Sequence, residues 1–185
     1  PYPNPFNGTV NFDFSLISSS HVLVQIFNLK GHDFPFSSLA IDVNRKMPLV
    51  TLEKIKQYYE GSIKNKKILL LGVSYKQNVG DTRYSPSETF FNQAKKLGAH
   101  IDVHDPLVDY WKETGVDVFL KLPSMNEYDV ALFAVPHKVY SEIDLSSWVS
   151  DDHKCLLFDA NHVLSKKQIA DIASKCCDYL SVGKG

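Results

Sequence analysis

Charged and aromatic residues gather in one short segment of the chain, between residues 75 and 85. In order, this segment contains Tyr75, Lys76, Asp81, Arg83 and Ser85. A lysine ammonium binds phosphate oxygens as a mobile point charge, and an arginine guanidinium binds them as a fixed fork. The segment therefore predicts an anion site that would take a phosphate or a pyrophosphate.

The residues on either side of this segment predict a strand that leads into it and a helix that follows it. The apolar run Ile68–Val73 is typical of a buried parallel strand, which we expect over Lys67–Val73. Ser85 and Pro86 are typical of a helix start, and Glu88 would complete a capping box. A loop between the carboxyl end of a strand and a helix is where open α/β sheets bind ligands.

The rest of the chain alternates between strand and helix patterns. This alternation is typical of the α/β class, and we expect a Rossmann-like, doubly wound, mostly parallel sheet of five or six strands. The expected elements are a helix over Pro86–Leu97, a strand over 100–106, an irregular helical stretch over Val108–Glu113, strands over Val116–Leu120, 128–137 and 155–163, a helix with a Ser165/Gln168 capping box, and a closing strand over 178–183.

The first third of the chain has a different pattern. Residues 1–28 contain two runs that alternate apolar and polar residues, which predicts a β-hairpin or two strands of a sandwich. A helical pattern follows, in which Pro48 is expected to kink or restart the helix. Its apolar stripe consists of Leu39, Val43, Met47, Val50 and Ile55. We therefore divide the chain into a hairpin segment (1–28), a connecting helix (29–62) and a Rossmann-like domain (63–185).

Composition excludes several classes of protein. The 185 residues carry a net charge of −1 and no long basic run, which argues against nucleic acid as a partner. No stretch approaches the ~18 apolar residues that span a membrane. The three cysteines have no metal-ligand spacing, and the adjacent Cys176 and Cys177 are poor disulfide partners. We expect these cysteines and Cys155 to be packing residues of a reduced, cytoplasmic protein.

Three other residues could take part in a site. Asp105 ends an expected strand, where Rossmann proteins often bind a ribose hydroxyl, although Asp-Pro is also an ordinary turn. His137 and His162 each follow an expected strand near the carboxyl edge of the sheet. We expect both to be loop histidines rather than catalytic groups.

The ordered set Tyr75-Lys76, Asp81, Arg83 and Ser85-Pro86 resembles a loop of the UDP-glucose/GDP-mannose dehydrogenase family, in its carboxyl-terminal domain. The resemblance continues through "IDVNRKMP", "YDVALFAVPH" and "LLFDANHVL" and covers about residues 30–185. It implies an NAD-dependent oxidation that converts the C6 hydroxyl of a UDP-hexose to a carboxylate, as in polysaccharide biosynthesis. In that family the carboxyl-terminal domain binds the UDP part of the substrate.

The resemblance also implies residue roles. Tyr75 and Lys76 would contact the nucleotide-sugar, Arg83 would reach the pyrophosphate of the NAD cofactor, and Asp81 and Ser85 would orient the loop. Alternatively, Asp81 and Arg83 form only a surface ion pair worth ~0–1 kcal/mol. The chain departs from the family at Asn161-His162, where many relatives carry an arginine that helps hold the substrate.

Parts of a complete enzyme are not found in this sequence. No Gly-x-Gly-x-x-Gly follows a strand, and no cysteine has the Gly-Gly-x-Cys context of the family's catalytic thiol. We therefore expect NAD to be bound mainly by domains absent here, and the chain to bind a UDP-sugar or related nucleotide without catalysing its oxidation.

The alternative is a non-catalytic interaction module that self-associates as a homodimer through residues 1–28. This segment resembles part of the carboxyl-terminal sorting domain of type IX secretion, although it stands at the opposite end of the chain and the later strands of that domain are missing.

Overall fold

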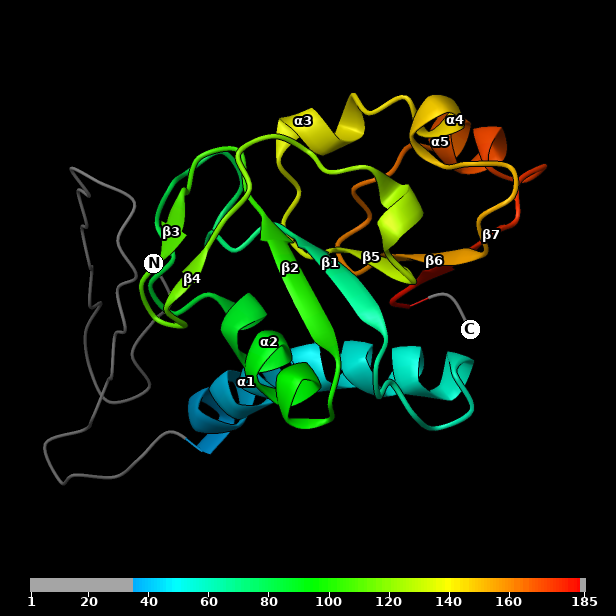
Figure 1. Cartoon of the computed structure of the whole chain (residues 1–185). Coiled ribbons are helices and arrows are strands. Elements are labelled where there is room, and N and C mark those ends of the chain that lie inside the picture. Colours follow the sequence, from blue (N-terminus) through cyan, green and yellow to red (C-terminus); the bar gives the residue numbers. More distant parts are fainter. Residues whose placement is uncertain (1–34, 184–185) are drawn as a thin grey trace, which may run out of the picture. The chain divides into compact units, whose positions relative to one another are not determined.

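A five-stranded parallel sheet organises the part of the chain that the computed structural model describes, residues 35–183. The β-hairpin expected over residues 1–28 lies outside these residues. The chain divides into two units, Pro1–Leu39 and Ala40–Gly185, and the second contains the sheet. The strands are β1 (Lys67–Leu71), β2 (His100–His104), β5 (Val130–Phe133), β6 (Cys155–Asp159) and β7 (Cys177–Ser181), in the order β2-β1-β5-β6-β7 (Figure 1).

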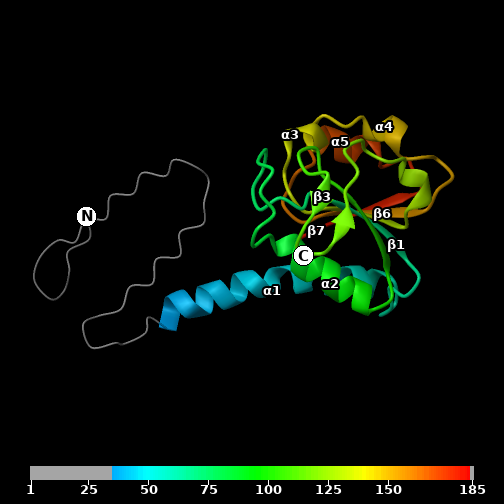
Figure 2. The same ribbon diagram turned by 60° about the vertical axis from the view of Figure 1, so that its left-hand side comes forward.

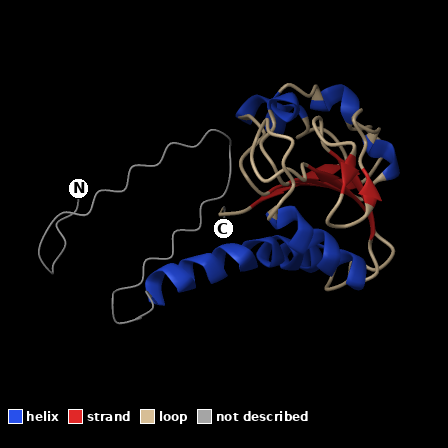
Figure 3. Cartoon of the chain, turned by 90° about the vertical axis from the view of Figure 1, so that its left-hand side faces the viewer, coloured by secondary structure: helices blue, strands red, loops and turns tan. Residues whose placement is uncertain are grey.

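Helices cover both faces of this sheet, as the expected doubly wound fold requires. Figure 3 shows the sheet as a layer between two groups of helices, with α1 and α2 on one side and the shorter helices on the other. The helices are α1 (Pro35–Tyr58), α2 (Pro86–Lys96), η1 (Met125–Glu127), α3 (Lys138–Ser141), α4 (Leu145–Trp148) and α5 (Lys166–Asp171). Among the described residues, no helix combines the length and the apolar character needed to cross a membrane.

The strand order reverses direction next to β1. From β1 the chain moves to β2 on one side, and later returns to β5 on the other. Leu71 at the end of β1 is in register with His104 of β2 and Phe133 of β5, so three loops leave the sheet at the same edge. In an open α/β sheet this reversal opens a crevice in which ligands bind.

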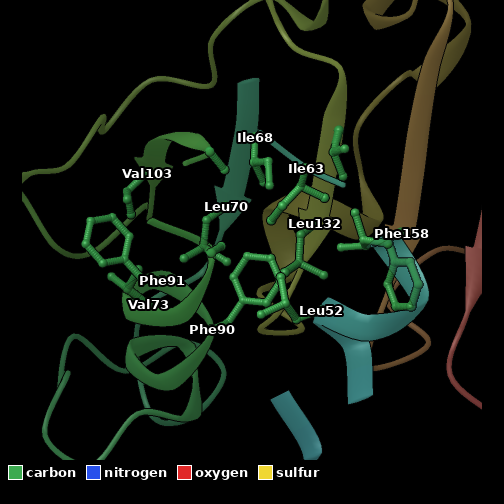
Figure 4. Close-up of a cluster of buried hydrophobic side chains, with 14 of the residues drawn as sticks. Leu52, Ile63, Ile68, Leu70, Val73, Phe90, Phe91, Val103, Leu132 and Phe158 are labelled. Carbon is green, nitrogen blue, oxygen red and sulfur yellow. The ribbon is translucent and has the colours of Figure 1, made fainter. Parts of the chain in front are cut away.

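Two apolar layers fix the helices to the sheet. On one face, Phe90 and Phe91 of α2 and Leu52 of α1 pack against Ile68 and Leu70 of β1 (Figure 4). On the other face, a second cluster contains Leu69 and Leu71 of β1 with residues of the shorter helices. Because alternate residues of β1 point to opposite faces, its apolar run from Ile68 to Leu71 is what a strand buried on both sides needs.

Helix α1 differs from the expectation in two respects. It continues through Pro48 without a break, so the predicted restart does not occur. Of the predicted apolar stripe, Ile55 is buried, whereas Leu39, Val43, Met47 and Val50 are exposed. Figure 2 shows that the carboxyl-terminal part of α1 passes close to α2, in agreement with the burial of Leu52 and Ile55 in that part.

The helical stretch predicted over Val108–Glu113 is wrong. These residues contain β3 (Tyr110–Trp111), which pairs with β4 (Val116–Asp117) as an antiparallel hairpin. Trp111 is fully buried and packs edge-on against Phe91 at 5.4 Å between ring centroids. Burial of this one large side chain against α2 decides the local structure, over a weak local preference for helix.

Candidate functional site

The loop between β1 and α2, residues 72–85, lies at the reversal point of the sheet and begins with an unusual glycine. Gly72 has φ +95°, and a β-carbon added to it would lie 2.4 Å from Cβ of Val135, in the loop after β5. Only glycine allows both this backbone conformation and this close approach. The first residues of the two loops are therefore pressed together above β1 and β5.

Asp105 anchors the start of the same loop from beneath. Its side chain is fully buried and accepts hydrogen bonds from the N–H groups of Val73 and Ser74 at 2.9 and 3.1 Å. It also accepts from the Ser74 hydroxyl at 2.8 Å and from the Leu107 N–H at 3.0 Å. A carboxylate that is buried and saturated in this way holds the backbone, which agrees with the interpretation of Asp105 as part of a turn.

The environment of Asp105 keeps it ionised. Burial by itself would raise the pKa of this carboxyl. Hydrogen bonds from the His137 side chain and from the backbone of Leu107 and Val73 outweigh that effect and hold the pKa below its ordinary value. The loop is therefore tied to a fixed negative charge inside the protein.

The two cationic candidates lie on the exposed part of the loop. Arg83 forms a bidentate pair with Asp81, with Nε–Oδ1 at 2.9 Å and Nη2–Oδ2 at 2.7 Å. The hydrogen bond with Asp81 raises the pKa of Arg83. Lys76 is exposed, as is Tyr75 at 42 % of its surface. Lys76 and Tyr75 are thus exposed to solvent, and the pair with Asp81 orients the Arg83 guanidinium.

Ser85 serves as the N-cap of α2, as predicted. Its hydroxyl accepts from the Ser87 N–H at 3.3 Å, whereas the predicted capping box needs the N–H of Glu88. The Ser87 hydroxyl in turn donates to the carbonyl of Gly72 at 2.9 Å. The helix start and the loop start are therefore joined directly, which closes the loop at its base.

The remaining candidates lie at other strands of the same edge. Asn161 and His162 are both exposed and follow β6, and Asn161 Nδ2 donates to the Ala134 carbonyl. Beneath them, Asp159 is buried and accepts from the backbone of Val163 and Leu164 at 2.9 Å each. All three cysteines are free thiols, and only Cys176 is exposed.

An open cavity of about 570 Å³ lies away from this loop. It is bordered by η1, α4 and the side chain of Lys175. Two of its serine hydroxyls, those of Ser146 and Ser147, are bonded to Asp144 at the start of α4. None of the residues that line this cavity belongs to the loop between β1 and α2, so the cavity adds no group to the loop site.

Sequence reasoning treated Asp105 and His137 as separate candidates and missed that they are partners. His137 Nε2 lies 3.1 Å from Asp105 Oδ2, and both side chains are buried. One feature could have indicated this contact: each residue follows a strand that neighbours β1, so both are delivered to the same edge of a parallel sheet.

Comparison with known proteins gives a consistent picture. Residues 69–166 match the model of the UDP-glucose/GDP-mannose dehydrogenase family, UDP binding domain. UDP-glucose 6-dehydrogenase TuaD of Bacillus subtilis (strain 168) is 31% identical over 85 residues, which are 46% of this chain and 18% of the relative. UDP-N-acetyl-D-mannosamine dehydrogenase of Methanocaldococcus jannaschii is 27% identical over 135 residues, covering 69% of this chain and 30% of the relative.

Solved structures agree on the fold. A crystal structure of NDP-N-acetyl-D-galactosaminuronic acid dehydrogenase from Methanosarcina mazei Go1 has a TM-score of 0.70 at 23% identity. The match covers 87% of this chain and 34% of that chain. The matched part of this chain spans less than a third of the length of the two curated relatives, TuaD and the Methanocaldococcus jannaschii enzyme.

Proposed function

Because this chain belongs to the UDP-glucose/GDP-mannose dehydrogenase family, as its UDP-binding domain, we propose that it binds the UDP part of a nucleotide-sugar through the loop between β1 and α2. One observation carries the proposal. The family's ordered set of polar residues lies on a loop that is closed at its base and stands at the reversal point of the sheet.

In this proposal Lys76 and Tyr75 contact the substrate. The Lys76 ammonium is exposed on a loop whose start is held by Asp105, so its charge can follow a diphosphate while its backbone stays fixed. Tyr75 offers an aromatic face and a hydroxyl to the nucleotide-sugar. The exposed position of both residues is compatible with contact to a ligand above the sheet edge.

Arg83 is the residue we propose for the cofactor. Its pair with Asp81 uses Nε and Nη2, and a guanidinium has five N–H donors, so the others can donate to the pyrophosphate of NAD. The sequence has no Gly-x-Gly-x-x-Gly motif, and we therefore assign to this chain only that one contact. NAD supplies the oxidising power in this family, and the residues described here hold ligand rather than move a hydride.

Membership of this family also suggests an activity for the whole enzyme. We propose that this domain supplies one side of the site in which a UDP-hexose is oxidised to the uronate, in the cytoplasm and in a homodimer. Its contribution is to bind and orient the nucleotide, and the binding of an isolated domain should be weak, because one side of the ligand stays in water.

Calorimetric titration with UDP-glucose tests the proposal. We expect weak binding that falls about tenfold or more when Lys76→Ala removes a charge-assisted hydrogen bond, and that stays at this lower level in Lys76→Ala/Arg83→Ala, because Arg83 is proposed for the cofactor. The matched control is Lys96→Ala, since Lys96 is an exposed lysine at the far end of α2. Absence of heat at millimolar ligand, or unchanged binding in the double variant, would contradict the proposal.

A further inference from the structure

A buried histidine connects the middle of the candidate loop to the interior of the protein. His137 follows β5 and is 1 % exposed, while Asn78 belongs to the loop after β1. These two segments flank the reversal point of the sheet from its two sides. A contact between them therefore joins the two loops at the sheet edge where open α/β folds bind their ligands.

The hydrogen bonds of His137 define its tautomer. Nδ1 lies 3.0 Å from the backbone N–H of Asn78 and must accept that hydrogen bond. The proton of a neutral ring is then on Nε2, which donates to Asp105 Oδ2 at 3.1 Å. The imidazole thus links the buried Asp105 carboxylate to the backbone nitrogen of Asn78 and holds that nitrogen in place.

Asn78 is held by its side chain as well. It adopts φ +57°, a left-handed conformation, and its Oδ1 accepts from the Lys138 N–H at 3.1 Å. Close by, the Tyr75 N–H donates to the Asp81 carbonyl at 2.7 Å, so the loop returns on itself between these residues. Together these bonds fix the segment that carries Tyr75 and Lys76.

We propose that His137 is a positioning residue, which sets the conformation of residues 75–81 through Asn78 and thereby the affinity of the loop for a nucleotide diphosphate. The second part of this statement rests on the proposed function. His137 itself is buried beneath the loop, and its effect on a ligand passes through the backbone of Asn78.

Two substitutions separate the roles of the ring. His137→Leu removes both nitrogen atoms, whereas His137→Asn places an amide oxygen near the position of Nδ1 and keeps an acceptor for Asn78. The control is His100→Asn, because His100 is exposed at the amino end of β2, the opposite edge of the sheet. Circular dichroism of each variant checks that it is folded.

Hydrogen exchange of the Asn78 amide tests the link without any ligand. We expect slow exchange in the native protein, exchange at least about fivefold faster in His137→Leu, and protection retained in His137→Asn and His100→Asn. Nitrogen NMR should show His137 with a proton on Nε2 and none on Nδ1. Equal protection in the native protein and His137→Leu, or a proton on Nδ1 at neutral pH, would overturn the proposal.

Calorimetry with UDP-glucose at neutral pH tests the effect on binding. We expect about fivefold or greater weakening of binding in His137→Leu and less weakening in His137→Asn, which keeps an acceptor for Asn78. If native protein binds UDP-glucose and His137→Leu binds equally well, the positioning role fails while the proposed function stands. If native protein binds nothing, the proposed function fails, and the exchange measurement alone decides whether His137 positions the loop.

Discussion

Gly72 allows a direct test of how tightly the two loops at the sheet edge are pressed together. A β-carbon at this position would lie 2.4 Å from Cβ, 2.8 Å from Cγ2 and 2.9 Å from the backbone nitrogen of Val135. The last of these atoms belongs to the backbone and cannot rotate away. Gly72→Ala should therefore force one of the two loops to move.

The magnitude has two parts. A left-handed backbone conformation costs a residue with a β-carbon about 1–2 kcal/mol, and overpacking costs about 1–3 kcal/mol more. Gly61 separates them, because it has φ +93°, close to the +95° of Gly72, and no atom within 4 Å of its added β-carbon. We expect Gly61→Ala to lower the free energy of unfolding by about 1–2 kcal/mol and Gly72→Ala by about 2–5 kcal/mol.

Urea denaturation followed by tryptophan fluorescence measures both losses, since the chain has two tryptophans, Trp111 and Trp148, on opposite faces of the sheet. The difference between the two variants reports the steric contact with Val135. Equal losses of stability in Gly61→Ala and Gly72→Ala would refute the close approach on which the geometry of the loop depends.

Two further predictions concern buried titratable groups. Burial lowers the pKa of His104, although the charge of Asp105 opposes this effect. The unfolded chain therefore binds a proton at this histidine more readily than the folded protein does. As a result, the free energy of unfolding should fall as pH drops below about 6.5. A urea series from pH 8 to 5 should show a shallower fall in His104→Gln, and an unchanged slope would contradict this reasoning. Cys176 is exposed while Cys155 and Cys177 are buried, so a thiol reagent should modify one cysteine in native protein and three in urea; reaction of more than one in native protein would contradict the described packing.

Local sequence was sufficient for most features whose determining atoms are close along the chain, although the capping box predicted with Glu88 at the start of α2 does not form. The cap of α2 by Ser85 and the capping box of Ser165 and Gln168 were predicted, because such bonds join residues two or three positions apart. The alternation of buried strands and helices, and hence the class of fold, was predicted in the same way from periodic apolar residues. Residues 108–113 were assigned wrongly because a distant contact, between Trp111 and Phe91, overrides the local pattern there.

The class of fold, the start of α2 and the order of the polar residues on the loop each depend on residues that are neighbours in the chain, so all three could be predicted from local patterns. The contacts that hold the loop join segments that are far apart in the chain. Asp105 and His137 are 32 residues apart, and His137 and Asn78 are 59 apart. Their contacts exist because β1, β2 and β5 end at one edge of the sheet. Strand order and register are properties of the assembled sheet, and no local pattern contains them.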